Sequence, residues 1–185
     1  MKKRVIAYFL LMLTVFVTAA CGTKSESKSS SKPEKGNCTA IDCIKNLKSE
    51  NTVEEINKVI GFEGKLIDEK NNVYSWEIGK DDKLIATYYN GDKATIEAKY
   101  VVDELKNDKI DFSSYSEIQS LLKKGESLTY EEFNKKVNGT GLLYLISPSN
   151  KKYVWVNKKG EYLNANFSNS TGKCTFVTGR LEKKE

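Results

Sequence analysis

The amino-acid sequence predicts an α+β fold made of two tandem repeats, each with two short helices followed by a four-stranded antiparallel sheet. Residues 52–58 (TVEEINK) and 129–135 (TYEEFNK) match along their length, and each opens with the Thr-x-x-Glu pattern of a capping box at a helix start. Four short alternating segments separated by polar turns follow each matched stretch, which predicts antiparallel hairpins. The same order in both halves indicates an internal repeat.

The individual elements follow from local patterns. Apolar residues at helical spacing predict a short helix before each capping box, with Ile41, Ile44 and Leu47 in one half and Ile118, Leu121 and Leu122 in the other. The second helices should end near Gly61 and at residues 139–141, because glycine readily adopts the left-handed conformation found at helix ends. The predicted strands are 65–68, 73–78, 83–89 and 93–100, then 142–146, 153–157, 161–167 and 173–180.

Alternation along the strands predicts which side chains face the helices. The pairs that stay apolar in both halves are expected inside: Trp76/Trp155, Leu84/Leu163, Ala86/Ala165, Tyr88/Phe167, Ala94/Cys174 and Ile96/Phe176. The opposite face should be mixed and different between the halves, with Asn164, Asn166 and Val177 in the second half. We expect this face to bind a partner, because interfaces are enriched in Tyr and the core does not require these side chains. The contact candidates are Ile85, Tyr89, Val154, Val156 and Tyr162.

The N-terminal residues have the features of an export signal. Three basic residues precede an apolar run from Val5 to Val17, and small residues lead to Cys21. The segment Ala19-Ala20-Cys21-Gly22 resembles the lipobox of bacterial lipoproteins, in which the cysteine thiol receives a diacylglycerol, although Thr18 stands where Leu is usual. The resemblance implies attachment to the cell membrane through Cys21, on the extracytoplasmic side. Ordinary cleavage and an uncleaved anchor are the alternatives.

Composition shifts divide the chain into six parts. Residues 23–35 are rich in Ser and Lys and contain no apolar side chain, so they cannot bury surface and are expected to be a disordered tether. The expected organisation is a signal peptide (1–20), tether (21–36), first repeat (37–100), connecting segment (101–114), second repeat (115–181) and charged tail (182–185).

Three cysteines remain in the predicted mature domain. Cys38 and Cys43 are close enough in sequence to close a small disulfide loop beside the first helix, and Cys174 replaces Ala94 in the repeat, which suits a small buried side chain. Three free thiols are the alternative.

Several function classes are disfavoured by the composition. The formal charge of +5 includes three basic residues of the signal, without which 27 basic residues face 25 acidic ones, so nucleic acid is not an expected partner. The chain has no histidine and no metal-ligand spacing, and we expect neither a cofactor, nor a metal, nor enzymatic activity. Ser120-Leu121-Leu122-Lys123 spells the Ser-x-x-Lys of penicillin-interacting enzymes, but the companion motifs of those enzymes are absent.

Two helices followed by four strands, repeated and with the Thr-x-Glu-Glu helix start, resemble the β-lactamase inhibitory protein fold. The unit is also similar to a small outer-membrane lipoprotein domain that assists β-barrel assembly. The first resemblance implies a sheet surface that binds a partner protein and an acidic hairpin residue that enters the partner's active site; Asp81 is nearest to that acid by position. Asp82 and Lys83 stand where aromatic residues are expected, and the family's disulfides within each unit are absent.

These inferences predict a membrane-anchored, non-catalytic module that binds an exported or cell-envelope protein through its sheet face. Two alternatives stay open: an inhibitor of a β-lactamase or penicillin-binding enzyme, and an envelope assembly factor.

Overall fold

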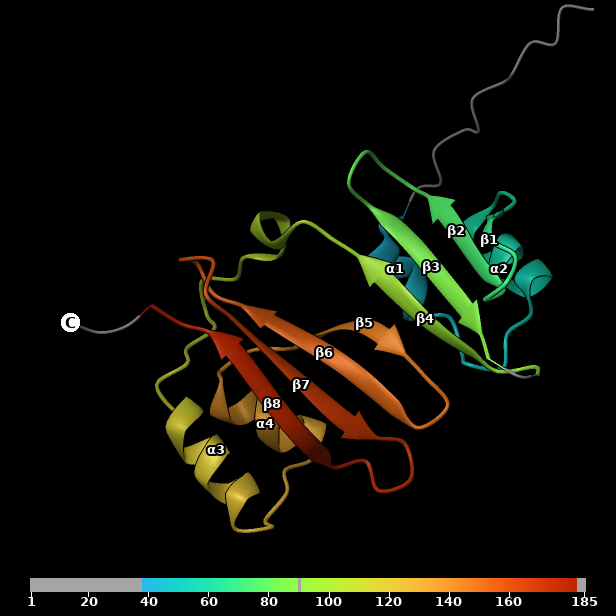
Figure 1. Ribbon diagram of the computed structural model, residues 1–185. Coiled ribbons are helices and arrows are strands. Elements are labelled where there is room, and N and C mark those ends of the chain that lie inside the picture. Colours follow the sequence, from blue (N-terminus) through green and yellow to red (C-terminus); the bar gives the residue numbers. More distant parts are fainter. Residues whose placement is uncertain (1–37, 90, 183–185) are drawn as a thin grey trace, which may run out of the picture. The chain divides into compact units, whose positions relative to one another are not determined.

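The strands of this protein form one antiparallel sheet. The computed structural model describes residues 38–89 and 91–182, and eight strands lie side by side in sequence order (Figure 1). They are β1 (Lys65–Asp68), β2 (Val73–Glu77), β3 (Lys83–Tyr88), β4 (Ala94–Lys99), β5 (Leu142–Ile146), β6 (Asn150–Val156), β7 (Tyr162–Ser168) and β8 (Cys174–Arg180). The predicted signal peptide, the lipidation site Cys21 and the tether lie outside the described residues.

The predicted fold class is therefore wrong. Strands β4 and β5 pair through Ile96 with Ile146 and Glu97 with Leu145, so the expected two four-stranded sheets are a single eight-stranded one. Strand residues make up 35% of the described residues and helical residues 23%, which makes the fold mainly β rather than α+β. Alternation within a strand shows which side chains share a face but not which strand lies alongside it. The pairing of β4 with β5, separated by residues 100–141, was thus missed.

Short helices flank the sheet. They are α1 (Ala40–Ile44), α2 (Val53–Ile60), the 3-10 helix η1 (Val102–Leu105), α3 (Tyr115–Lys123) and α4 (Tyr130–Lys136). Both predicted capping boxes are confirmed: the Thr52 hydroxyl accepts the Glu55 N–H, the Glu55 carboxylate accepts the Thr52 N–H, and Thr129 and Glu132 do the same for α4. Gly61 ends α2 with φ of 91°, as expected.

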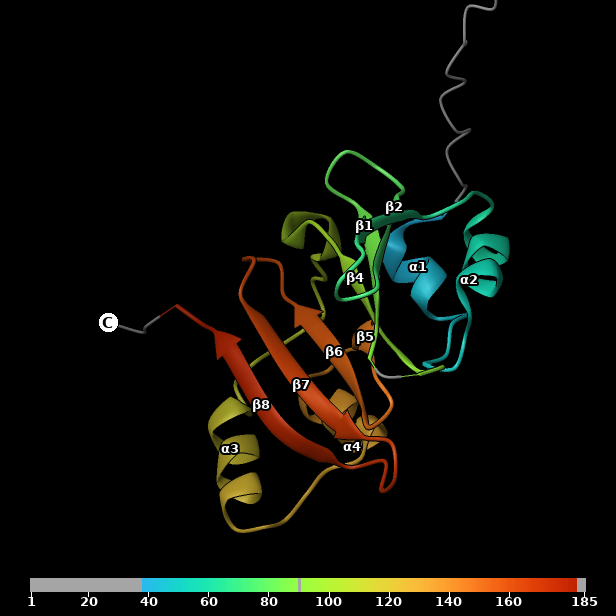
Figure 2. The same cartoon turned by 45° about the vertical axis from the view of Figure 1, so that its right-hand side comes forward.

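Both helix pairs lie on the same side of the sheet. Helices α1 and α2 cover β1 to β4, and α3 and α4 cover β6 to β8 (Figures 1 and 2). The strand pairing shows this, because residues directly opposite each other on neighbouring strands point to the same face. Ile96 faces α1 and pairs with Ile146. Ile146 pairs with Lys151, which is on the same side of β6 as the buried Trp155. The opposite face of the sheet carries no helix α1 to α4.

Two tryptophans centre the two apolar clusters in closely similar surroundings. Trp76 is fully buried, and its indole N–H donates to Asn57 Oδ1 at 2.8 Å, which also accepts the Gly64 N–H at 2.9 Å. Trp155 is likewise buried; Asn134 Oδ1 accepts from its indole N–H and from the Gly141 N–H, both at 3.0 Å.

Glycine is required beside each indole. A Cβ added to Gly64 would overlap the Trp76 ring, and one added to Gly141 would overlap the Trp155 ring. The helix, the glycine and the strand are thereby fixed together through a single asparagine in each half.

A bulge in β8 corrects the predicted inward set. Phe167 pairs with Cys174 and Asn166 with Phe176, so the extra residue Thr175 reverses the alternation between them. Phe176, predicted in the core, points away from the helices and is 61% exposed. Val177, predicted outside, is buried in the core instead.

The cysteines of the described part have two different roles. A disulfide joins Cys38 to Cys43 at the start of α1, whereas Cys174 is a free, buried thiol. Burial raises the pKa of the Cys174 thiol to about 11, so it is uncharged near neutral pH. Within residues 38–89 and 91–182, no helix has the length and apolar character needed to cross a membrane.

Candidate functional site

The candidate site is the sheet face opposite the helices, here called the open face. Its side chains follow from the strand pairing, since partners across a ladder share a face. The open face comprises Lys65 and Asp68 on β1, Val73, Ser75 and Glu77 on β2, Lys83, Ile85 and Thr87 on β3, Thr95, Glu97 and Lys99 on β4, Leu142 and Leu145 on β5, Asn150, Lys152, Val154 and Val156 on β6, Tyr162, Asn164, Asn166 and Ser168 on β7, and Phe176, Thr178 and Arg180 on β8.

One continuous row of side chains crosses the whole open face. Each member pairs directly with the next: Lys65, Ser75, Ile85, Glu97, Leu145, Lys152, Asn166 and Phe176, one from each strand. Ile85 and Leu145 are half-buried and Phe176 is exposed, so the row presents apolar surface among charged and amide groups. Phe176 is an exposed aromatic residue, a type in which protein interfaces are enriched.

The predicted contact residues differ in accessibility. Ile85 lies in the central row, Tyr162 is half-buried on β7, and Tyr89 is 64% exposed just after β3. Val154 and Val156 are on the predicted face but are each only 1% exposed, so neither offers surface to a partner.

The connecting segment packs against the end of β6, which the sequence did not show. The connecting segment does not simply join the two halves: η1 contacts β6, and the Asn107 N–H donates to the Val156 carbonyl at 3.0 Å. This segment therefore runs beside the end of β6.

The predicted acidic residue of the β2–β3 turn is exposed and lies away from the central row. Asp81 occupies this turn, which the Asp82 carbonyl closes by accepting the N–H groups of Ile78 and Gly79. The neighbouring Asp82 carboxylate accepts the Ala40 N–H with both oxygens at 3.1 Å, and its burial raises its pKa. Asp82 thus holds the start of α1 against the turn.

Tyrosines gather where β4 meets β5. The rings of Tyr100 and Tyr144 meet edge to face with centroids 5.6 Å apart. Burial raises the pKa of both phenols, and for Tyr100 the nearby Tyr144, Tyr162 and Glu97 add to this shift. Glu97 is ion-paired with Lys99 at 2.6 Å. The phenols of Tyr100 and Tyr144 are therefore neutral hydrogen-bonding groups near pH 7.

Two asparagines in β7 stand out chemically. The Oδ1 atoms of Asn164 and Asn166 are buried and accept no hydrogen bond, while the Asn166 side-chain nitrogen donates to Thr175 Oγ1 at 3.3 Å. A buried acceptor without a partner destabilises a fold by about 1–3 kcal/mol, and Asn is disfavoured in strands. Alternation in the sequence placed both asparagines on this face, but only the structure shows that their side-chain oxygens accept no hydrogen bond. The unusual Asn-x-Asn pattern inside a predicted strand was the available signal.

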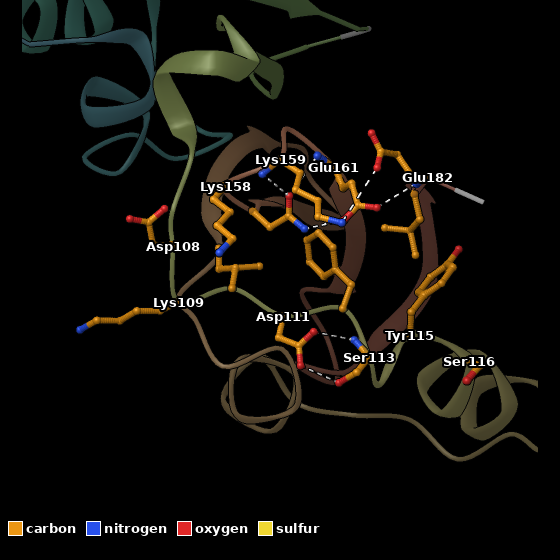
Figure 3. Close-up of a pocket in the computed structure, with 14 residues that line it drawn as sticks. Asp108, Lys109, Asp111, Ser113, Tyr115, Ser116, Lys158, Lys159, Glu161 and Glu182 are labelled. Carbon is orange, nitrogen blue, oxygen red and sulfur yellow. Dashed lines mark hydrogen bonds and ion pairs between the residues drawn. The ribbon is translucent and has the colours of Figure 1, made fainter. Parts of the chain in front are cut away.

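A cavity lies elsewhere, at the junction of segment 108–116, the β6–β7 turn and residues 181–182. It measures about 710 Å³ (Figure 3). Its polar groups bond to one another: Asn157 donates to the Glu161 carboxylate at 2.6 Å, which also accepts the Glu182 N–H. Figure 3 shows Asp108 and Lys109 directed away from the cavity. These contacts stabilise the turn.

Neither metal-ligand geometry in the described residues nor similarity to known proteins points to a function. The described residues contain no group of three or more acidic or cysteine side chains placed to hold a metal ion. No protein-family model, curated protein or solved structure matches the chain.

Proposed function

We propose that this chain is a bacterial lipoprotein, anchored through Cys21 at the outer side of the cell membrane, whose open face binds an exported or cell-envelope protein without catalysing a reaction. The observation that carries the binding role is the row across all eight strands. It leaves Ile85, Leu145 and Phe176 accessible on a face that no helix α1 to α4 covers. The resemblance to β-lactamase inhibitory proteins supports the same use of the sheet.

Site-specific photo-crosslinking in intact cells tests the binding role. A benzophenone amino acid at Ile85 or Phe176 should give a discrete crosslinked product. Val59 on α2 is a matched control, since it is also an exposed apolar position but is not on the open face. Equal products from all three positions, or none from the open face, would contradict the proposed function.

Anchoring is tested separately. Cys21→Ser should abolish incorporation of radiolabelled fatty acid and release the protein from the membrane fraction, and globomycin should cause the precursor to accumulate. Unchanged labelling of the Cys21→Ser variant would rule out this attachment site.

A further inference from the structure

Asn164 and Asn166 are not explained by folding. In the first half, the matching strand segment Leu84–Tyr88 carries Ile85 and Thr87 at these places, both good strand formers. The asparagines instead bury two amide oxygens without a hydrogen-bond partner. Groups that oppose folding and lie on an accessible face are often retained because a ligand uses them.

The surroundings of the two amides are basic. The amide patch consists of three aligned triplets from β6, β7 and β8: Lys152, Asn166 and Phe176; Val154, Asn164 and Thr178; Val156, Tyr162 and Arg180. Its charged members are one lysine and one arginine, and neither side chain forms an ion pair within the described part of the chain.

Charge on the other half of the open face is balanced. There, Glu77 lies directly opposite Lys83, and Glu97 is paired with Lys99. The unbalanced positive charge of the open face is thus concentrated on β6 to β8, which face the viewer in Figure 1 with α4 behind them.

The distance between the two charged residues of the amide patch sets the length of a ligand that can contact both. Lys152 and Arg180 occupy opposite corners of the amide patch, four residues apart along the strands and two strands apart across them. Standard sheet dimensions put their Cα atoms about 17 Å apart, which an extended chain spans in about five residues. Alternate side chains of such a chain face opposite sides, so about six residues is the nearest spacing that turns two side chains toward the patch. Rotation about the last side-chain bond, which is soft in Asn, turns either Oδ1 toward a donor above the sheet.

We infer that the amide patch binds an extended acidic segment of the partner protein, with Lys152 and Arg180 pairing with two carboxylates about six residues apart on one side of that segment and Asn164 and Asn166 accepting main-chain N–H groups between them. This inference rests on the proposed function and adds the chemistry of the partner.

A peptide titration with the full-length chain in detergent micelles tests it. The probe is a fluorescein-labelled peptide of about 12 residues of Gly, Ser and Val with two Glu about six positions apart, compared with the same peptide carrying Gln or Lys there. The Glu peptide should bind about tenfold more tightly than the Gln peptide, and its binding should weaken as salt rises from about 50 mM to about 300 mM.

Charge reversal gives the decisive comparison. The double variant Lys152→Glu, Arg180→Glu should prefer the Lys peptide, whereas the matched variant Lys58→Glu, Lys135→Glu on helices α2 and α4 should keep the preference for Glu. Asn164→Ile with Asn166→Thr should weaken Glu-peptide binding about tenfold while the protein stays folded. Equal binding of Glu and Lys peptides, equal effects of both charge reversals, or displacement of the peptide by neutral cell-wall glycan fragments would overturn the inference.

The cellular crosslink separates this inference from the proposed function. A wild-type crosslink that persists in Lys152→Glu, Arg180→Glu rejects the acidic segment but leaves partner binding intact. Absence of any crosslink in the wild type rejects partner binding itself.

Discussion

The helix side and the open side of the sheet differ in how far their two halves agree. On the helix side, Trp76 and Trp155 have the same asparagine and glycine contacts. On the open side, Ile85 and Thr87 of β3 correspond to Asn164 and Asn166 of β7. Burial of the indoles constrains the first set in both halves, whereas no common packing requirement constrains the second. The open side is thus where the halves can carry different binding chemistry.

Truncation of either tryptophan should cause the largest loss of stability. Trp76→Ala and Trp155→Ala should each lower the free energy of unfolding by about 3–5 kcal/mol, because each leaves a cavity in a closely packed cluster. Urea unfolding followed by circular dichroism measures both. If one variant lost less than half as much as the other, the two clusters would not be equivalent.

Removal of the bridging asparagines should lower the free energy of unfolding by different amounts in the two halves. Asn57→Ala leaves the N–H groups of both Trp76 and Gly64 without an acceptor, and we expect a loss of about 2–3 kcal/mol. Asn134→Ala should cost about 1 kcal/mol, since the Trp155 indole also donates to the Gly139 carbonyl at 3.1 Å. Equal losses measured by urea unfolding would show that the second acceptor does not compensate.

A tyrosine should make part of the stability sensitive to alkali. The Tyr88 hydroxyl donates to the Asn51 carbonyl at 2.8 Å, and burial raises its pKa from 10.0 to about 12. The folded state therefore keeps this proton where the unfolded state loses it, so its contribution is full below pH 10 and is lost as the pH rises toward 12.

Tyr88→Phe should accordingly lower stability by about 1 kcal/mol near neutral pH, and its difference from the wild type should shrink above pH 10. Urea midpoints across this range provide the measurement, with exposed Tyr89→Phe as the control. A difference that grows with pH would contradict the assigned direction.

The capping boxes should contribute similar, smaller amounts. Thr52→Ala and Thr129→Ala should each lower the free energy of unfolding by about 1 kcal/mol, because each removes the acceptor for a helix-start N–H. The double variant should show the sum of the two effects, as expected for sites without shared partners. A strongly non-additive loss would mean that the caps are coupled through the sheet.

The smallest predicted effect is an increase in stability, not a loss. Asn164→Ile should raise the free energy of unfolding by about 0.5–1 kcal/mol, because it removes an unpaired buried oxygen and places a better strand former in β7. Ile85→Asn should lower it. Destabilisation by Asn164→Ile would indicate that the amide is satisfied in solution and would remove the stability argument for the amide patch.

Local features were the most predictable part of this fold. Thr52 and Thr129 form the predicted capping boxes, and each of the eight strands lies within a few residues of its expected position. These features depend on neighbouring residues and on short-range periodicity. The wrong α+β assignment came from a long-range event, the pairing of β4 with β5, which leaves no trace in either strand's own pattern.

The same distinction applies to the candidate site. Ile85 and Tyr162 were placed correctly by alternation, but the bulge at Thr175 reversed Phe176 and Val177, and Val154 and Val156 are buried although they lie on the predicted face. An inserted residue in a strand and the burial of a side chain on an open face are both set by tertiary packing. Lys152 and Arg180 were missed because charged side chains are common, and only their register with two unpaired amides distinguishes them.

The position of α1 has a mechanical consequence. This five-residue helix, closed by the Cys38–Cys43 disulfide and held by Asp82, contacts both β4 and β5 and so spans the join between them. Tension applied through the N-terminal end of the chain would be delivered first to α1, and the disulfide would prevent its first turn from unravelling. A force from a membrane anchor would therefore act on β4 and β5 together, at the place where they pair, instead of separating a single strand from the edge of the sheet.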